Sequence, residues 1–297
     1  MKWRRGTGAG QVEDFRGRGG GGGGLGGGLG GFPMGKAGGG GLGIILMLVV
    51  LFLSGGLPGG GGGGGFPINL PAAPAGPAAG GEQPPASDDE AQFVQFVVAD
   101  VQETWTKIFA EANQTYEPTT LRLFTSGIQT GCGNASSAVG PFYCPADRHV
   151  YIDLGFFREL QTRFGAKGDF AQAYVIAHEF GHHVQSLLGV SEDVNRQQQE
   201  DPEGANELSV RLELQADCLA GVWGYSANQE GLLEPGDVEE GLNAAAAVGD
   251  DRIQEQSGRN ADPDSWTHGS AEQRMAWFQK GFDKGDPSAC DTFKGDV

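Results

Sequence analysis

Three residues near the middle of the chain have the types and the spacing needed to hold and use a metal ion. His178, Glu179 and His182 form the pattern H-E-x-x-H. Residues four apart project from one face of a helix, so both imidazoles can bind a single zinc ion. Glu179 stands beside the metal, where it can take a proton from a water that the metal activates. The pattern predicts metal-assisted hydrolysis. The alternative is a buried helix whose histidines share no purpose, which is costly for polar rings.

A hydrolytic zinc site needs a third protein ligand and leaves its fourth position open. The extended pattern H-E-x-x-H-x-x-G-x-x-H is excluded, because Gln185 and Leu188 stand where it requires glycine and histidine. A carboxylate from a later helix is the remaining option. We expect Glu213 to supply it, with Glu207 as the main rival. The predicted cofactor is therefore a zinc ion held by the two histidines and this glutamate.

Two neighbours of the expected third ligand have separate predicted roles. Asp217 lies four residues after Glu213, so the two carboxylates share a helix face. Asp217 can accept a hydrogen bond from the free ring N–H of His178 or His182 and so fix that ring's tautomer. Cys218 points about 100° away on a helix, which favours a disulfide over a metal ligand.

The chain has three further histidines of interest. His268 comes just before the last expected helix, and near the zinc it could act in catalysis by stabilising the oxyanion of a tetrahedral intermediate. A capping or surface role is the alternative for His268, because no spacing rule ties it to the motif. His183 is displaced from the ligand face, which favours a structural role such as a bond to a carbonyl. His149 falls on an expected strand and could line the cleft.

The helix that carries the H-E-x-x-H residues is well signalled between Asp169 and Leu188. Asp169 can act as its N-cap with Gln172 as capping-box partner, and Gly189 fits its end. Apolar residues recur along it at helical spacing: Phe170, Ala173, Tyr174, Ala177, Val184 and Leu187.

The other expected elements give a small β-sheet followed by helices, which is an α+β arrangement. The strand signals are a run at 121–129 and a hairpin at 136–153, while 191–201 reads as a loop. The remaining helices are expected at 93–111, 155–164, 202–227, 237–253 and 271–282.

Composition divides the chain into a low-complexity part and a globular part. Most of the 54 glycines lie before residue 82. We expect a disordered, basic and Gly-rich cytoplasmic segment at 1–40, a transmembrane anchor at 41–57, and a Gly/Pro/Ala-rich linker at 58–87. The zinc metallopeptidase domain would then occupy 88–297. The net charge of −18 makes nucleic acid an unsuitable partner.

The expected anchor is short. Its apolar core, Ile44 to Leu53, has only ten residues, whereas a typical membrane helix has about 20. A signal-peptide core or a buried strand are the alternatives. A signal peptide would need an unusually long n-region here, so we expect an uncleaved single-pass anchor. Because basic residues precede it, the globular part should lie outside the cytoplasm.

Four cysteines lie in the globular part, and an even number suits disulfides in an oxidising compartment. Cys132 and Cys144 bracket a short loop, so we pair them, which leaves Cys218 with Cys290. Three pairings are possible for four cysteines, and four reduced thiols in a cytosolic protein are the alternative.

The chain resembles the bacterial neutral zinc metallopeptidase family of the YpfJ type. The resemblance implies a membrane-anchored, zincin-like domain whose third ligand follows the Glu-x-x-x-Asp pattern of gluzincins, here Glu213 and Asp217. The segments that carry the resemblance are 1–4, 12–14, 140–145, 151–153, 178–185, 213–218, 267–270, 281–282 and 290–293.

Together these observations predict a membrane-anchored zinc endopeptidase that hydrolyses peptide or protein substrates outside the cytoplasm. Glu179 would be the general base, and the hairpin at 136–153 could pair its edge strand with an extended peptide. The alternative from another class is a non-catalytic envelope protein that binds a partner and holds a structural zinc. A zinc hydrolase of another amide, such as a cell-wall peptide, would use the same residues.

Overall fold

The structure is a computed structural model that describes residues 1–6, 8, 10–17 and 81–297. Within these residues a small sheet and a layer of helices form an α+β fold, as the sequence predicts. The strands are β1 (Val12–Asp14), β2 (Leu121–Phe124), β3 (Gly127–Thr130), β4 (Gly133–Ser136), β5 (Phe142–Cys144) and β6 (His149–Asp153). The helices are α2 (Asp89–Glu111), α3 (Gly155–Thr162), α4 (Asp169–Leu187), α5 (Val190–Glu200), α6 (Ala205–Gln229), α7 (Asp237–Ala247), α8 (Asp250–Gln256) and α9 (Ala271–Lys284).

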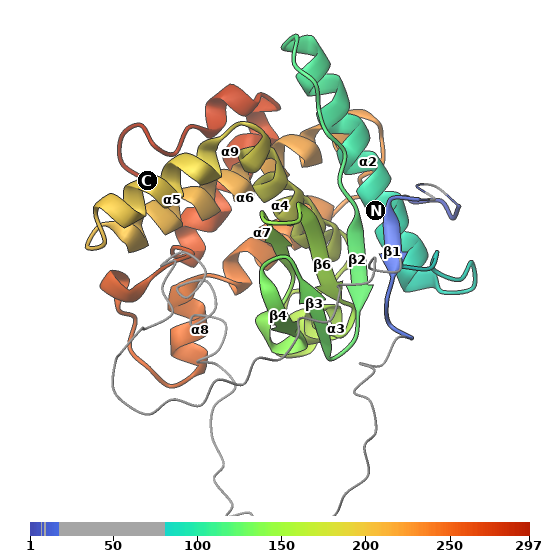
Figure 1. Ribbon diagram of the computed structural model, residues 1–297, viewed down its shortest axis with the longest axis horizontal. Coiled ribbons are helices and arrows are strands. Elements are labelled where there is room, and N and C mark those ends of the chain that lie inside the picture. Colours follow the sequence, from blue (N-terminus) through green and yellow to red (C-terminus); the bar gives the residue numbers. More distant parts are fainter. Residues whose placement is uncertain (7, 9, 18–80) are drawn as a thin grey trace, which may run out of the picture.

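The main sheet has the order β1-β2-β6-β5. β1 and β6 run parallel to the central β2, and β5 pairs antiparallel with β6 at one edge. Alternate side chains of the two inner strands enter the core, so that Leu121, Leu123, Val150 and Ile152 are fully buried. Figure 1 shows α2 alongside β1 and β2, with α4 behind the sheet. The sheet thus supports the helix that carries the H-E-x-x-H residues.

Close packing of α6 against α9 brings two distant parts of the chain together. A Cβ atom on Gly281 of α9 would lie 1.9 Å from the carbonyl oxygen of Cys218 on α6. A Cβ atom on Gly221 of α6 would lie 2.1 Å from the carbonyl oxygen of Phe278. Only glycine permits such an approach of two backbones. The two expected disulfides are present, and the bond between Cys218 and Cys290 fastens the C-terminal segment to α6.

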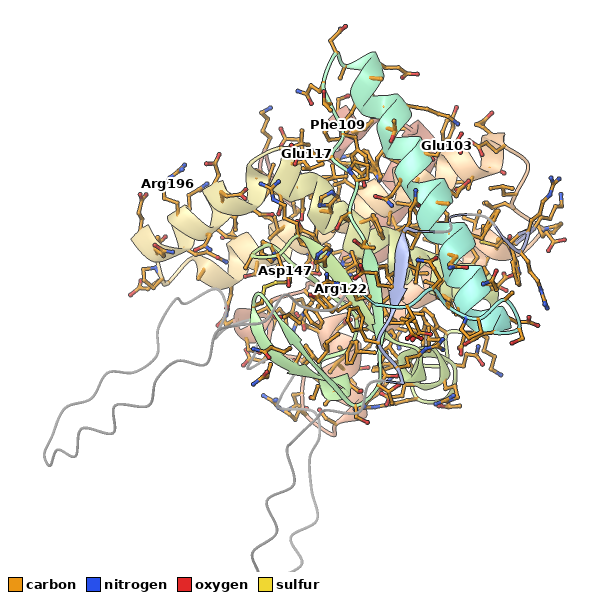
Figure 2. The ribbon with its side chains drawn as sticks, turned by 45° about the vertical axis from the view of Figure 1, so that its right-hand side comes forward. Glu103, Phe109, Glu117, Arg122, Asp147 and Arg196 are labelled. Carbon is orange, nitrogen blue, oxygen red and sulfur yellow. A yellow bond between two sulfur atoms is a disulfide. The ribbon has the colours of Figure 1, made fainter. Side chains whose placement is uncertain are left out.

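The expectation of disorder from residue 1 to 40 is wrong for the described residues 1–6, 8 and 10–17, which pack on the domain. Val12 is fully buried, and β1 extends the sheet with Val12 opposite Leu121 and Glu13 opposite Arg122. The Arg122 Nε atom donates to Glu13 Oε2 at 2.8 Å, and Arg122 lies on the sheet in Figure 2. The strand has only three residues and its partner is far away in sequence. The expectation of disorder rested on the average composition of residues 1–40, which is dominated by glycine and does not show so short a strand.

Several predicted boundaries also differ from the structure. The expected strand at 121–129 ends at Phe124, because Ser126 has a φ of 67° and the chain turns there into the separate β3–β4 hairpin. The segment 191–201, expected to be a loop, is mostly helix α5, since Gly189 (φ 76°) ends α4 and α5 begins at Val190. The expected helix at 237–253 is two helices, broken before Asp250.

Asp169 does not act as the N-cap of α4. Gly168, with a φ of 105°, holds that position, and the first-turn amide of Phe170 donates instead to Glu240 Oε2 of α7 at 3.2 Å. The Asp169 carboxylate instead accepts a hydrogen bond from the Met1 ammonium at 2.5 Å. The capping-box prediction was wrong because this carboxylate has a partner 168 residues away, which local spacing cannot reveal.

The predicted anchor at 41–57 lies outside the described residues. Among the helices that the structure does describe, none is long and apolar enough to cross a bilayer.

Candidate metal centre

Helices α4 and α6 bring the three predicted ligands to one point. His178 Nε2 lies 3.2 Å from Glu213 Oε2, and His182 Nε2 lies 3.4 Å from Glu213 Oε1. One potential ligand atom from each residue lies within 4.8 Å of the others. α4 and α6 pack so closely here that a Cβ atom on Gly181 would lie 3.0 Å from the carbonyl oxygen of Ala216. The two histidines point toward α6 because they lie on one face of α4.

The spacing of these donor atoms fits a zinc ion. Zinc–ligand bonds of 2.0–2.2 Å in a tetrahedral arrangement place neighbouring ligand atoms about 3.3 Å apart. The measured separations of 3.2 and 3.4 Å therefore agree with that geometry. Two imidazoles and one carboxylate are also a donor set that hydrolytic zinc sites use. Residues His178, His182 and Glu213 can thus hold a zinc ion without rearrangement.

A buried network fixes the first histidine. His178 Nδ1 lies 2.8 Å from Asp217 Oδ1, so Asp217 can hold the ring with Nε2 free for a metal. Asp217 is fully buried and also accepts hydrogen bonds from Arg274 and from the Tyr174 hydroxyl. Arg274 lies on α9, and no spacing in the sequence linked it to the motif. Its position depends on the α6–α9 packing described above.

The second histidine has a partner that was not among the predicted site residues. His182 Nδ1 lies 2.8 Å from Gln185 Oε1. The Gln185 amide nitrogen donates to the Leu212 carbonyl at 2.7 Å and to Gln215 Oε1 at 3.1 Å, so its orientation is fixed from α6. Gln185 therefore accepts a hydrogen bond from the His182 ring and directs Nε2 to the centre, as Asp217 does for His178. Its spacing of three from His182 was a usable signal.

Glu179 is buried next to the two imidazoles, with 8% of its surface exposed. Burial raises the pKa of its carboxyl group, and the nearby His178 and His182 rings offset only part of that shift. A raised pKa makes this carboxylate a better proton acceptor than an exposed glutamate. Glu179 thus has both the position and the basicity that the H-E-x-x-H pattern predicts for a general base.

His268 lies in the segment before α9, near enough to Glu213 for each group to influence the pKa of the other. Its Nδ1 atom lies 3.2 Å from Asp250 Oδ1, and the other Asp250 oxygen accepts hydrogen bonds from the backbone amides of Thr267, His268 and Gly269. Burial lowers the pKa of His268, but Asp250 and Glu213 outweigh burial and raise it. The Nε2 atom forms no hydrogen bond with any described residue, so it is available to a substrate oxygen.

Carboxylates dominate the electrostatics of the centre. Burial lowers the pKa of His178, but Asp217 and Glu213 outweigh burial and raise it to about 10. Burial raises the pKa of Glu213, and the His182 and His178 rings reverse this and hold it well below its usual range. The field at the rings therefore favours a bound positive charge, which agrees with a cation site.

Three residues considered from the sequence lie elsewhere. His183 points away from the centre, with Nε2 2.7 Å from the carbonyl oxygen of Glu117 and Nδ1 3.1 Å from the Tyr143 hydroxyl. Glu117 lies in the segment just after α2 (Figure 2). His149 on β6 is not one of the described residues that group around the metal position. Glu207, the rival ligand, is exposed and pairs with Arg211 at 2.8 Å.

The sequence of the chain matches one protein family and several relatives. The sequence model of the family described as "Putative neutral zinc metallopeptidase" matches residues 1–293. The uncharacterized protein YpfJ of Escherichia coli strain K12 is 52% identical over 210 residues, which are 70% of this chain and 73% of that protein. The uncharacterized protein Mb2605 of Mycobacterium bovis is 54% identical over 184 residues, 58% of this chain and 61% of its own. No solved structure matches the chain. The chain therefore belongs to the putative neutral zinc metallopeptidase family.

Proposed function

We propose that this protein is a zinc-dependent endopeptidase. The observation that carries the proposal is the convergence of His178, His182 and Glu213 at tetrahedral ligand spacing, with the buried Glu179 beside them. A metal site that only stabilises a fold usually closes its fourth position with a protein ligand. The described cluster contains three such ligands, not four. Cys218 is bonded to Cys290 and His183 faces Glu117, so neither can serve as the fourth.

The zinc ion would be held by the two histidines and Glu213, and when bound it supplies a Lewis acid that polarises a carbonyl and acidifies water. Glu179 takes the proton from the attacking water and delivers it to the leaving amine, because it lies beside the two imidazoles without being a ligand and burial raises the pKa of its carboxyl group. His268, oriented by Asp250, donates a hydrogen bond from Nε2 to the carbonyl oxygen as negative charge develops there. Asp217 and Gln185 keep both ligand rings in place throughout.

An extended peptide can bind along β5. β5 is at the edge of the main sheet, pairs only with β6 among the described strands, and packs against α4. The free side of an edge strand offers backbone donors and acceptors to a peptide strand. Such pairing is independent of side-chain identity, which suits a peptide or protein substrate and supports the choice of peptide-bond hydrolysis.

The two disulfides support a location outside the cytoplasm, since such bonds persist in oxidising compartments. The predicted single-pass anchor at 41–57 conflicts with the pairing of β1 and β2. A single crossing would put residues 1–17 and the zinc domain on opposite sides of the membrane, and the two strands could not then meet. We propose that the docked form has both parts on the same, extracytoplasmic side.

The test is zinc content and peptide hydrolysis measured on one sample of the full chain. We expect about one zinc per chain, hydrolysis of a mixed peptide library, loss of activity on chelation, and recovery when zinc is returned. His182→Ala and Glu213→Ala should lose zinc, while His149→Ala, a histidine outside the cluster, should keep it. Full zinc content without hydrolysis of any peptide would contradict the peptidase proposal and favour a structural metal site.

A further inference from the structure

A cavity of about 570 Å³ is lined by residues that are close in sequence to two residues of the metal centre, Glu213 and His268. It lies between the start of α6, the segment before His268, the start of α9 and the C-terminal residues. The side chains that matter for its chemistry are Glu203, Glu207, Val210, Asp264, Trp266 and Asp296.

The cavity and the metal centre are built from neighbouring residues of the same two segments. Val210 precedes the ligand Glu213 by three residues on α6, which is less than one helical turn, or about 5 Å. Trp266 precedes His268 by two residues in the segment between α8 and α9. Gly269, the residue after His268, packs close to Val210, since a Cβ atom there would lie 3.2 Å from Val210 Cγ1. A peptide held at the metal can therefore place a long side chain next to the reacting bond into this cavity.

The charge of the cavity is strongly negative. Glu203, Asp264 and Asp296 are exposed and form no ion pair with a described residue. The cation of the lining is Arg211, which binds Glu207 at 2.8 Å and donates to the carbonyl oxygen of Thr292 at 2.5 Å. Its guanidinium is thus occupied and does not neutralise the three free carboxylates. A cationic occupant would find complementary charge here.

The interior of the cavity suits the aliphatic part of such an occupant. Val210 is 8% exposed and Trp266 is partly buried against the core. The Trp266 indole donates to Gln254 Oε1 at 3.3 Å, which holds the ring in place. Lysine and arginine side chains place their methylene groups on apolar surface and their charged ends in water, and an aromatic ring attracts their positive charge. The acidic rim would face the positive charge of a basic side chain, and the apolar floor would contact its methylene groups.

We propose that this cavity is a specificity subsite for a lysine or arginine side chain of the substrate, adjacent to the scissile bond. The inference rests on the proposed peptidase function and adds a class of substrate to it. The overall charge of −18 would also attract basic peptides toward the protein.

The test uses pairs of peptides that differ only in one residue near the cleavage site, lysine against norleucine and arginine against citrulline. We expect the full chain to hydrolyse the basic member with a kcat/KM about ten times higher, because several weak charge contacts add. The double variant Glu203→Gln/Asp264→Asn should lose roughly three- to tenfold of that preference and leave the neutral peptides unchanged. The matched control Glu111→Gln/Glu239→Gln removes two exposed carboxylates outside the cavity and should keep the preference.

A binding measurement separates failure of this inference from failure of the peptidase proposal. Zinc-loaded Glu179→Gln protein should bind the lysine peptide more tightly than its norleucine twin, and the difference should shrink between about 50 and 500 mM salt. Hydrolysis of both peptides at equal rates would overturn the subsite and leave the peptidase intact. If no peptide is hydrolysed, the peptidase proposal fails, and equal binding of the two peptides would then overturn the subsite separately.

Discussion

Arg274 binds Asp217 through two parallel hydrogen bonds, from Nε to Oδ2 at 2.7 Å and from Nη2 to Oδ1 at 2.9 Å. Both residues are almost fully buried, and the shared oxygen Oδ1 is the one that contacts His178. The orientation of His178, the first of the proposed metal ligands, is therefore set from α9, a helix that contributes none of the proposed ligands. The planar guanidinium matters here because an ammonium cannot reproduce two parallel bonds.

Arg274→Lys should keep the charge but lose this geometry. We expect zinc affinity to fall roughly 10–100-fold, the usual effect of removing a group that orients a metal ligand. Competition with a chelator of known affinity measures the change, and thermal unfolding shows whether the fold is intact. Lys280→Arg, a substitution of the same two residue types on the exposed side of α9, is the control. Unchanged zinc affinity in Arg274→Lys would show that Asp217 orients His178 without Arg274.

Asp100 should make stability depend on pH. Burial raises the pKa of Asp100 to about 6, although the Trp223 indole donates to it at 2.7 Å and opposes the shift. The folded state then binds more protons than the unfolded chain between about pH 4 and pH 6, so the contribution of this group to stability falls as pH rises through that range.

Asp100→Asn keeps an acceptor for Trp223 and removes the charge. Above pH 6 the variant should be more stable than the natural protein by at most about 3 kcal/mol, and the two should converge near pH 4. Denaturant unfolding at a series of pH values measures the difference. Glu111→Gln, at an exposed position of the same helix, should show no such pH-dependent gain. A constant difference between Asp100→Asn and the natural protein would contradict the raised pKa.

Glycine at position 281 should be required for the approach of α9 to α6. Gly281→Ala places a methyl group 1.9 Å from a backbone oxygen, so the helices must separate. We expect a loss of at least about 1–3 kcal/mol in the free energy of unfolding. Ser288→Ala, which lies outside the contact between α6 and α9, is the control and should leave the free energy of unfolding nearly unchanged. Weaker zinc binding should accompany the loss of stability, because Arg274 would move with α9.

The pairing of β1 with β2 predicts a cross-link in the intact protein. Glu13 and Arg122 are opposite each other in the parallel register, and their side chains touch. Glu13→Cys combined with Arg122→Cys should form a third disulfide in the intact full chain. Glu111→Cys with Arg122→Cys is the control that should not cross-link. Failure of the first pair to cross-link, with both thiols reactive, would mean that β1 is undocked and would restore the single-pass topology.

The grouping of the proposed ligand residues could be predicted from the sequence because each pair lies on a single helix. His178 and His182, like Glu213 and Asp217, are four apart, and helix geometry alone puts such pairs on one face. The assignment of Asp217 to His178 and not to His182 required the antiparallel packing of α4 and α6, which spacing does not contain.

The remaining parts of the site and fold depend on contacts between distant segments. Arg274 and Asp250 orient Asp217 and His268 through contacts that the motif does not contain. Strand β1 is too short to show the alternation of apolar and polar residues that predicts a strand. It is recognised only from its pairing with β2, where Val12 lies opposite Leu121. In the same way, Asp169 reads as a helix cap until its ion pair with Met1 is seen.

The most direct test of the account is peptide hydrolysis by zinc-loaded Glu179→Gln beside the natural full-length protein. The substitution keeps the size of the side chain and removes the base, and Glu179 is not among the ligand group. The account predicts about one zinc ion in each protein and a loss of at least about 100-fold in kcat for the variant. Equal activity in the two proteins, at equal zinc content, would contradict the assignment of Glu179 as the general base and with it the proposed mechanism.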